Sequence, residues 1–548
     1  MAYTTRSRAA IYACVGIVAL TTAPARILAS PQEQEHEQKG AGLGPGCAPD
    51  RPASAHHAGG LSVETPRGNV APIPCLTNTG WRTRETSIAV TNRGTVLVQP
   101  AFPPVLPTGS PVGLIRSSDK GLTWEFVDPH VTPARIAPID VNSWSDRDTG
   151  RIFWTSDLVG LNAFGIASRD GTDVYVDHSD DDGRTWVRSS SLPGMTYDHT
   201  QIFTGPPPSK LRNRMRTYPN IVYVAVSGGF TCTVFNFCGT HIARSFDGGM
   251  TFGESVAIPY PAECPAPGAF PSGGYGLNGV VARDGIVYLP FTPCERPYVA
   301  VSRDGGSTWN LSLLAETETT GYGELGLGID KQGNLYAAWT ALSDRLLYLA
   351  ISRDGARHWD QPLMIAAPGV NETSVPQLVA GKRGQVAVAY YGSKNSPGRP
   401  FPPPCSGVAS VECAGYENEI WDAYVTEAFD ALAKKPLFWS ATLNDPADPV
   451  WYGYTPTAMR VHSASGVVFA GNLGAYRPPN RSGHLDYFGM TMAPDNTPWA
   501  AFSQECPFGQ PRGNRNCSQA TGGQLDGQFI LVGRLVGAHG KEDEKNDD

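Results

Sequence analysis

The sequence predicts an all-β protein, a single β-propeller of four-stranded antiparallel blades, with seven blades favoured over six. Three observations lead to this prediction. A short motif recurs five times at intervals of 50 to 66 residues, as expected of one supersecondary unit repeated along a chain. Short apolar segments separated by turns precede the copies, and helix signals are scarce. The composition, with 61 Gly, 47 Pro and 10% aromatic residues, suits many short strands and turns.

The repeated motif has the form Ser-x-Asp-x-Gly-x-Thr-Trp, and its copies begin at Ser117, Ser179, Ser245, Ser302 and Ser352. The last copy has Ala356 in place of the glycine, and His358 in place of the threonine. The aspartate can accept hydrogen bonds from amides of its own turn, and the glycine can adopt a positive φ. We therefore interpret each copy as a structural clasp of a hairpin rather than as a chemical site.

These five copies resemble the Asp-box, or BNR, repeat of the sialidase-like β-propellers. The resemblance implies a propeller architecture. It implies less about activity, because sialidases, other glycosidases, sorting receptors and assembly factors share the motif, and a fold does not determine its function.

The units of the propeller follow one another along the chain. Five strand–turn–strand units that end in a box are expected to begin near residues 85, 139, 198, 278 and 324. Two further units keep this pattern without a box, near residues 375–390 and 487–502, and residues 528–532 supply a late strand. These units sum to seven blades, whereas propellers of the sialidase type have six, so six blades stay the alternative.

The N-terminus has the features of a secretory signal peptide, which we place at residues 1–29. Arg6 and Arg8 precede an apolar stretch at residues 9–20. This stretch is shorter than the roughly 18 residues that a membrane span needs, and no later segment is long enough. We expect a flexible leader at residues 30–60, the propeller at 61–539 and a charged tail at 540–548, in a protein that is secreted or periplasmic.

Cysteine usage agrees with export. Of the 11 cysteines, Cys14 lies in the predicted signal peptide, and an even number remains, which indicates disulfides in an exported chain. Sequence alone does not fix their connectivity. Pairing of near neighbours would give Cys47–Cys75, Cys232–Cys238, Cys264–Cys294, Cys405–Cys413 and Cys506–Cys517.

The net charge and the spacing of Cys and His residues exclude some classes of partner and cofactor. The net charge of −8 argues against a nucleic-acid partner. No Cys or His spacing supports a zinc site, so we predict no metal ligands and no cofactor, with a structural divalent cation such as calcium left open. The expected partner is a glycan or glycoconjugate, and the expected state is a monomer.

Candidate functional residues stand at the heads of the innermost strands, which surround the central channel of a propeller. Five of these strand starts are acidic and one is an amide. The acidic ones are Glu85, Asp140, Asp198 (followed by His199), Glu324 and Asp486 (followed by Tyr487), and the amide is Asn278. Packing does not require charges there. They either satisfy neighbouring amides and arginines or form a functional ring, which could hold a hard cation or supply paired carboxylates for glycoside hydrolysis.

The resemblance to sialidases implies a more specific set. That family binds the carboxylate of its sugar with three arginines, and uses a Tyr paired with a Glu and an Asp that serves as acid and base. Arg84 occupies the place of the family's early arginine, and Arg460 and Arg477 are candidates for the others.

The same resemblance assigns the remaining roles. Tyr322 with Glu324 is the candidate nucleophile pair, and Asp140 or Asp198 is the candidate acid. Substrate binding is expected from the three arginines together with Glu85, His199, Asp486 and Tyr487.

Two functions follow from these candidates. The leading hypothesis is a sialidase-like, exo-acting glycoside hydrolase that acts on glycans. The alternative is a non-catalytic propeller that binds glycan or protein through its channel face, with or without a structural cation. Several carboxylates at the mouth would repel an anionic sugar unless arginines outnumber them locally, which weighs against a sialoside.

Overall fold

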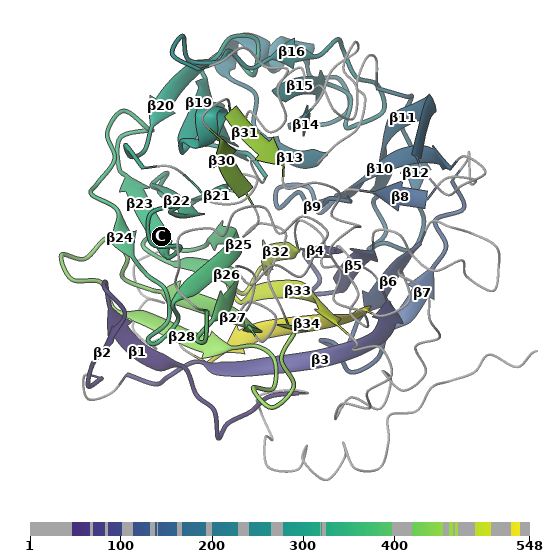
Figure 1. Ribbon diagram of the computed structural model, residues 1–548. Helices are drawn as coiled ribbons and strands as arrows, with labels where there is room; N and C mark the ends of the chain where they lie inside the picture. The colour runs from purple at the N-terminus through teal and green to yellow at the C-terminus, as the bar shows by residue number, and fades with distance from the viewer. Residues whose placement is uncertain are drawn as a thin grey trace, which may run out of the picture.

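The computed structural model describes residues 46–65, 69–82, 86–100, 113–131, 137–139, 141–161, 167–192, 200–227, 240–264, 278–317, 319, 325–396, 419–452, 460–463, 466–469, 488–505 and 528–537. These residues form seven antiparallel sheets arranged as a ring (Figure 1), so the prediction of a seven-bladed, all-β propeller is confirmed. The only helical segments among them are two 3-10 turns, η1 (Ser209–Arg214) and η2 (Pro293–Glu295).

The first five blades each end in a box. Blade one contains β4 (Thr86–Val90), β5 (Val96–Pro100), β6 (Leu114–Ser117) and β7 (Glu125–Val127). Blade two contains β8 (Ala137–Ile139), β9 (Ser143–Ser145), β10 (Ile152–Leu161), β11 (Ala167–Ser179) and β12 (Val187–Arg188), and both β8 and β9 pair with β10. Blade three contains β13 (Gln201–Gly205), β14 (Ile221–Ser227), β15 (Thr240–Ser245) and β16 (Val256–Ala257).

Blades four and five keep the four-stranded pattern. Blade four contains β17 (Val280–Val281), β18 (Val287–Phe291), β19 (Tyr298–Ser302) and β20 (Asn310–Leu313). Blade five contains β21 (Leu325–Ile329), β22 (Leu335–Thr340), β23 (Leu347–Ser352) and β24 (Leu363–Met364).

Blades six and seven have no box, and both take strands from the N-terminal part of the chain. Blade six contains β25 (Glu372–Ala380), β26 (Val386–Ser393), β27 (Ile420–Ala428) and β28 (Phe438–Thr442), with β1 (Ser54–His57) and β2 (Leu61–Ser62) added at its edge. In the same sheet, β29 (Trp451–Tyr452) pairs with β27. Blade seven contains β32 (Gly489–Met492), β33 (Pro498–Glu505), β34 (Gln528–Val536) and β3 (Ile73–Arg82). A separate hairpin joins β30 (Arg460–Ser463) to β31 (Gly466–Phe469).

The ring is closed by pairing between distant parts of the chain. β3 lies antiparallel to β34, with Ile73 opposite Val536 and Asn78 opposite Leu531. Because β3 covers the outer edge of blade seven, the N-terminal and C-terminal parts of the propeller hold each other. β3 covers the edge of β34 and becomes the outer edge strand of blade seven, as propellers keep short outer edges.

The first added strand also changes the expected boundary of the propeller. Ser54 to His56 of β1 pair with Ser440 to Phe438 of β28, so this part of the predicted leader at 30–60 belongs to blade six. The predicted signal peptide, the leader up to residue 45 and the tail at 540–548 lie outside the described residues. Within the described part of the chain, no helix is long and apolar enough to cross a membrane.

The hydrophobic core is divided into clusters between neighbouring blades. One cluster joins Phe203 and Tyr223 of blade three to Leu289 and Phe291 of blade four, and equivalent clusters lie at the other six junctions. Each sheet is therefore buried on both faces. This explains why inner strands such as β4 are buried at every position instead of alternating between buried and exposed residues.

The boxes have the hydrogen bonds that the motif predicts. In blade four, Oδ1 of Asp304 accepts hydrogen bonds from the backbone nitrogens of Ser307 and Thr308, both at 2.9 Å, and Oδ2 accepts one from the Thr308 hydroxyl at 2.7 Å. The Ser302 hydroxyl accepts a hydrogen bond from the Gly306 amide at 2.7 Å. The aromatic residue of the box has a wider role than expected, because Trp309 packs into the core shared with blade three.

The fifth box keeps this geometry although two of its residues differ from the motif. Ala356 has a φ of +64°, where the other copies have glycine, and Nδ1 of His358 lies 2.5 Å from Oδ2 of Asp354, where the others have a threonine hydroxyl. The turn therefore needs the left-handed conformation even when the sequence does not offer glycine.

Two of the expected disulfides are confirmed, Cys47–Cys75 and Cys264–Cys294. The first one fixes the chain before β1 to β3. The other expected pairs involve Cys232, Cys238, Cys405, Cys413, Cys506 and Cys517, which lie outside the described residues.

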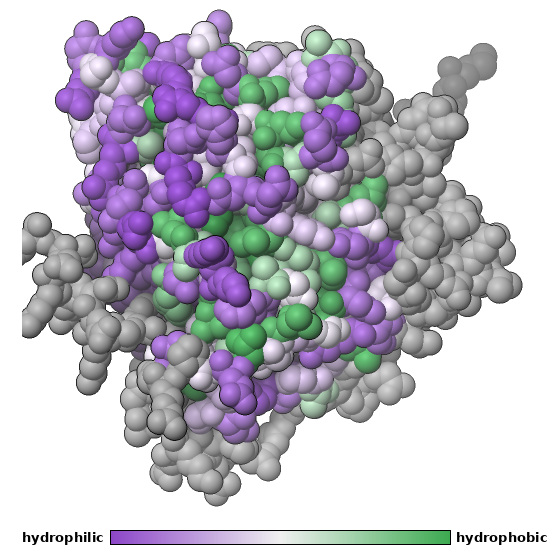
Figure 2. All heavy atoms as spheres, turned by 90° about the vertical axis from the view of Figure 1, so that its left-hand side faces the viewer, coloured by the Kyte–Doolittle hydropathy of each residue, from purple (hydrophilic) through white to green (hydrophobic). Residues whose placement is uncertain are grey.

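The outer surface mixes residue types. Figure 2 turns the left-hand side of Figure 1 toward the viewer and shows hydrophobic residues interspersed with hydrophilic ones. The large hydrophobic residues that are exposed in the described chain belong to different blades and turns: Leu61, Val70, Leu122, Val187, Met250 and Ile420. Single exposed apolar residues are normal for a protein surface.

Candidate functional site

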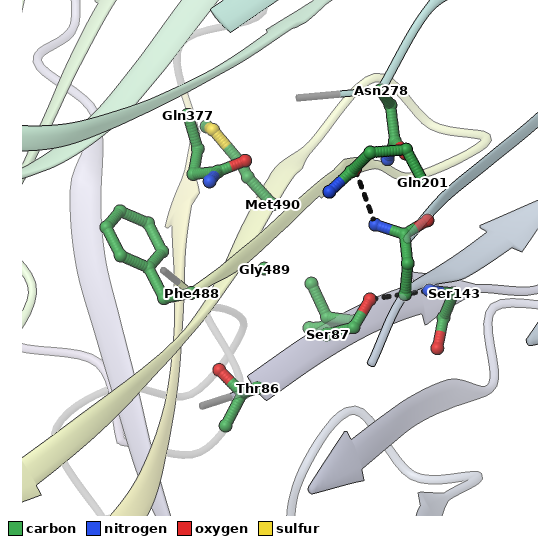
Figure 3. Close-up of a pocket in the computed structure, with 11 residues that line it drawn as sticks. Thr86, Ser87, Ser143, Gln201, Asn278, Gln377, Phe488, Gly489 and Met490 are labelled. Atoms are coloured by element: carbon green, nitrogen blue, oxygen red, sulfur yellow. Dashed lines mark hydrogen bonds between the residues drawn. The ribbon is translucent and has the colours of Figure 1, made fainter. Parts of the chain in front are cut away.

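A polar pocket lies where the innermost strands meet around the channel (Figure 3). The innermost strands β4, β9, β13, β17, β21, β25 and β32 each contact the innermost strand of the next blade, which completes a ring. The empty space at the pocket amounts to about 290 Å³ when the adjoining open solvent is included. Its lining comes from six of the seven blades: Thr86, Ser87, Ile88, Asn142, Ser143, Gln201, Asn278, Gln377, Phe488, Gly489 and Met490.

Strand starts bring the polar side chains to this position. Thr86 and Ser87 begin β4, Gln201 begins β13, and Asn278 stands two residues before β17. Sequence analysis also placed Asn278 at a strand start on the channel, and the structure confirms this position. A hydroxyl or amide group there can meet the ends of neighbouring strands, whose first backbone groups have no partner in their own sheet.

The close approach of two strands depends on Gly489. A Cβ atom at this position would lie 2.5 Å from the backbone nitrogen of Ile88 and 2.8 Å from the Cα of Ser87. Contact between β32 and β4, which closes this side of the pocket, therefore requires glycine.

Hydrogen bonds tie the first three blades together at the pocket. Nδ2 of Asn142 donates to Oε1 of Gln201 at 3.0 Å, and Oδ1 of Asn142 accepts from the Ile202 amide at 3.1 Å. The Ser143 amide donates to the hydroxyl of Ser87 at 2.6 Å. These side chains are held in fixed orientations because each joins two blades.

Gln99 supports this arrangement from behind. Its Oε1 accepts a hydrogen bond from the Ser143 hydroxyl at 3.2 Å, and its Nε2 donates to the backbone oxygen of Thr155 at 2.9 Å. Gln99 is 1% exposed, so its amide holds the pocket wall without contacting solvent.

Two polar atoms of the lining are left without a partner. Oδ1 of Asn278 and Nε2 of Gln377 are buried and make no hydrogen bond. Gln377 is 8% exposed, and Figure 3 shows its side chain and that of Asn278 directed into the pocket. A buried polar atom without a partner costs about 1–3 kcal/mol, so these two atoms mark where a bound group would be stabilised.

The described lining is neutral. Its polar groups are hydroxyls and amides, which bind by hydrogen bonding and do not transfer protons near neutral pH. The charged candidates of the sequence analysis are chain neighbours of this lining: Glu85 directly precedes Thr86, Asp140 stands two residues before Asn142, and Asp486 stands two residues before Phe488.

The structure does not describe most of the predicted site residues. Ten of them lie outside the described residues: Arg84, Glu85, Asp140, Asp198, His199, Tyr322, Glu324, Arg477, Asp486 and Tyr487. Arg460 is the first residue of β30. The charge pattern of the sequence did not point to the neutral pocket residues, although amides and hydroxyls recur beside the same strand starts: Thr86, Ser87, Asn142, Ser143, Gln201 and Gln377.

A buried charged cluster joins blade five to blade six. Nη1 of Arg345 donates to Oε2 of Glu372 at 2.6 Å, and the Ser396 hydroxyl donates to the same oxygen. Glu419 is fully buried beside them, and neither of its carboxylate oxygens makes a well-formed hydrogen bond.

The surroundings of Glu419 favour its neutral form. Burial and the negative charge of Glu372 raise the pKa of Glu419 to about 9, although the nearby hydroxyls of Ser396 and Ser393 and the charge of Arg345 act in the opposite direction. The carboxyl therefore holds its proton at neutral pH, which is consistent with its burial without a full set of partners.

Cation binding finds no ready site in the part of the chain that the structure describes. No group of three or more His, Cys, Asp or Glu side chains there is arranged to hold a metal ion. The acidic strand starts that suggested a structural cation lie mostly outside those ranges.

Comparisons with known proteins found similar chains among solved structures. No protein-family model matches the chain, and no curated protein matches it. A protein of unknown function from Dyadobacter fermentans is similar at 12% identity over 84% of this chain and 96% of its own, with a TM-score of 0.38. The NanB sialidase from Streptococcus pneumoniae is similar at 12% identity over 86% of this chain and 70% of its own, with a TM-score of 0.35.

A further solved structure, a leech intramolecular trans-sialidase, is similar at 12% identity over 84% of this chain and 68% of its own, with a TM-score of 0.34. Similarity at this level says nothing about activity. The class of the protein follows from its own geometry: seven blades in a closed ring, with Asp-box turns in five of them, define a seven-bladed Asp-box β-propeller.

Proposed function

We propose that this propeller binds the terminal part of a glycan at the mouth of its channel. The observation that carries the proposal is the pocket lining of hydroxyl and amide groups contributed by six blades. Neutral groups that are held in place by hydrogen bonds between blades match a ligand rich in hydroxyls, because both sides offer donors and acceptors. Two buried atoms of the lining make no hydrogen bond within the protein.

Hydrolysis of the bound glycan is the second candidate function, of the exo-acting kind that sialidases illustrate. Its support is the position of the acidic candidates in the sequence: Glu85, Asp140 and Asp486 stand one or two residues before pocket-lining residues, and Glu324 directly precedes β21. In this proposal Tyr322 with Glu324 supplies the nucleophile. A Tyr has a pKa near 10 in water, so it needs such a neighbouring base to attack at neutral pH.

The remaining roles are proposed on the same basis. Asp140 or Asp198 would protonate the leaving group, and a set of arginines would bind an acidic sugar if the substrate carries one. Those arginines and the other substrate-binding candidates are Arg84, Arg460, Arg477, Glu85, His199, Asp486 and Tyr487.

One pair of measurements separates binding from hydrolysis. The purified protein is applied to a glycan array, and in parallel to a panel of 4-methylumbelliferyl glycosides that includes the sialic-acid conjugate. Array binding without release of the fluorophore supports a non-catalytic propeller, and release supports a hydrolase. If neither binding nor release is detected with any glycan, the proposal is wrong.

Variants then test the catalytic candidates. Glu324→Gln and Tyr322→Phe should each abolish release of the fluorophore while preserving binding on the array, and Arg84→Ala should abolish release from the sialic-acid conjugate. Glu316→Gln is the matched control, because Glu316 is 77% exposed and lies outside the channel lining. Equal activity of Glu324→Gln and wild type would exclude the proposed nucleophile pair.

The chemical setting of the protein is also proposed. Export to the cell exterior or periplasm rests on the signal-like N-terminus, and the two disulfides support it because they persist in oxidising compartments.

A structural divalent cation is a separate proposal. A rise in the midpoint of thermal unfolding in calcium over that in EDTA would support it, and equal midpoints would contradict it.

A further inference from the structure

The two unpartnered atoms of the pocket differ from the rest of its lining. Asn142 has both ends of its amide engaged, Ser143 is bonded to Ser87 and Gln99, and Thr86 donates to the backbone oxygen of Ala501 at 2.6 Å. Asn278 and Gln377 alone among the described lining residues contribute a buried side-chain atom with no partner. They come from blades four and six.

The two atoms specify what kind of group would satisfy them. Oδ1 of Asn278 needs a donor, and Nε2 of Gln377 needs an acceptor. A hydroxyl can meet either need, because it donates one hydrogen bond and accepts two. A hydroxyl can serve either end of an amide, but one hydroxyl shared by both side chains matches one oxygen and one nitrogen and cannot donate to two oxygens.

Size and charge restrict the group further. The enclosed part of the pocket has room for little more than one water-sized group. No charged side chain belongs to the described lining, so an ionised carboxylate placed there would lose its hydration without gaining an opposite charge. A hydroxyl loses less, because it is uncharged and a hydrogen bond to an amide replaces a contact with water.

We propose that Asn278 and Gln377 are specificity-determining residues that bind a hydroxyl group of a neutral sugar at the channel mouth and discriminate against acidic sugars. This inference rests on the proposed glycan binding and deepens it by naming the ligand class.

The test uses matched neutral and acidic ligands. Isothermal titration calorimetry measures the binding of methyl glucoside against methyl glucuronide, and of methyl galactoside against methyl galacturonide. Each pair differs only by a hydroxymethyl group and a carboxylate. A neutral glycoside is expected to bind at least about tenfold more tightly than its acidic partner, since losing one hydrogen bond to a buried group costs about that factor or more.

Variants assign the preference to the two residues. Asn278→Asp and Gln377→Glu are nearly isosteric and are each expected to weaken binding of the neutral glycoside about tenfold. Asn310→Asp, in the outer strand of blade four, and Gln361→Glu, after the box of blade five, are exposed controls that should leave binding unchanged. Gln377→Met replaces the glutamate variant if the latter fails to fold, which circular dichroism and thermal unfolding monitor.

Deoxy ligands separate direct contact from a general effect on the pocket. A monodeoxy glycoside that lacks the recognised hydroxyl should bind wild type and Gln377→Met with equal affinity, because the hydrogen bond is absent in both. The inference is overturned if neutral and acidic ligands bind equally, or if all deoxy ligands keep the full effect of the variants. If wild type binds no glycoside at all, the proposed function itself fails, which is a different result.

Discussion

Arg345 in the β22–β23 turn of blade five donates a hydrogen bond to Glu372 at the start of β25 in blade six, with 2.6 Å between the two atoms. The two side chains are only 6% and 2% exposed. A turn of one blade is thereby joined to the innermost strand of the next. The backbone oxygen of Arg345 strengthens the link, because it accepts hydrogen bonds from the amide and the hydroxyl of Thr373.

Removal of the Arg345 charge should destabilise the propeller. Arg345→Met leaves the Glu372 carboxylate buried without its cation, which costs about 3–5 kcal/mol in comparable buried pairs. Urea unfolding at pH 7 measures this loss in the free energy of unfolding. Arg353→Met is the control, because Arg353 and Asp360 form an ion pair whose side chains are 44% and 51% exposed. Exposed pairs contribute about 0–1 kcal/mol, so similar losses in both variants would contradict the assignment.

Glu419 should make the protein less stable as the pH rises. The carboxyl releases its proton near its ordinary pKa of 4.5 when unfolded and near 9 when folded, so the native state binds one more proton between these values. Stability therefore falls across this window, by about 1.4 kcal/mol per pH unit for one proton.

Glu419→Gln should remove that contribution. The variant should be more stable than wild type at pH 8.5 and not at pH 4.5, as measured by urea unfolding at both values. A remaining slope is expected from Glu427, whose pKa burial raises to about 8. An unchanged pH dependence in Glu419→Gln, like that of the exposed control Glu316→Gln, would refute the prediction.

Replacement of Ala356 in the fifth box by glycine should stabilise the protein. Its φ of +64° is a left-handed conformation that costs an L-residue roughly 1–2 kcal/mol, while glycine loses part of this gain through its greater freedom in the unfolded chain. Ala356→Gly should therefore raise the free energy of unfolding by about 0.5–1 kcal/mol in a denaturant titration.

The reverse change in the fourth box is the matched comparison. Gly306 has a φ of +88°, and a Cβ there would lie 3.2 Å from Cδ of Arg244. Gly306→Ala should lower stability by about 1 kcal/mol or more. Effects of the same sign in the two variants would show that the left-handed turn is not the cause.

His56 should make the attachment of β1 sensitive to acid. Its ring nitrogen Nε2 lies 2.6 Å from the Ser440 hydroxyl, and the side chain is fully buried. Burial lowers the pKa of His56 below its ordinary 6.5; the backbone oxygen of His57 opposes this effect and the ring of His57 adds to it. The unfolded chain therefore takes up a proton first, and stability is lost as the pH falls below about 6.5.

Hydrogen exchange at β1 and β28, corrected for intrinsic rates, tests this prediction at pH 7.5 and 5. Protection of residues 54–57 should fall at pH 5 in wild type and fall less in His56→Gln, which stays neutral. His130→Gln is the exposed control, since its side chain is 86% exposed. Equal protection at both pH values in wild type would contradict the prediction.

The sequence predicted the features that depend on residues close together in the chain. Asp304, Gly306 and Thr308 form their hydrogen bonds within seven residues, so the motif alone predicts the turn, and its recurrence predicts the blade. The disulfides Cys47–Cys75 and Cys264–Cys294 join cysteines that are neighbours in the order of cysteines, although the sequence alone does not fix this pairing. Seven blades could be predicted because each unit has the same order of strands and turns.

Only the tertiary structure decided which distant groups meet. β3 pairs with β34 across more than 400 residues, and β1 joins blade six, because the ring closes and leaves those edges free to accept a strand. Asn278 and Gln377 show no special pattern in the sequence. In the folded ring, both line the same pocket, and each has one buried atom without a hydrogen-bond partner. A turn is determined by the residues within it, whereas the partner of a buried polar side chain depends on packing between blades.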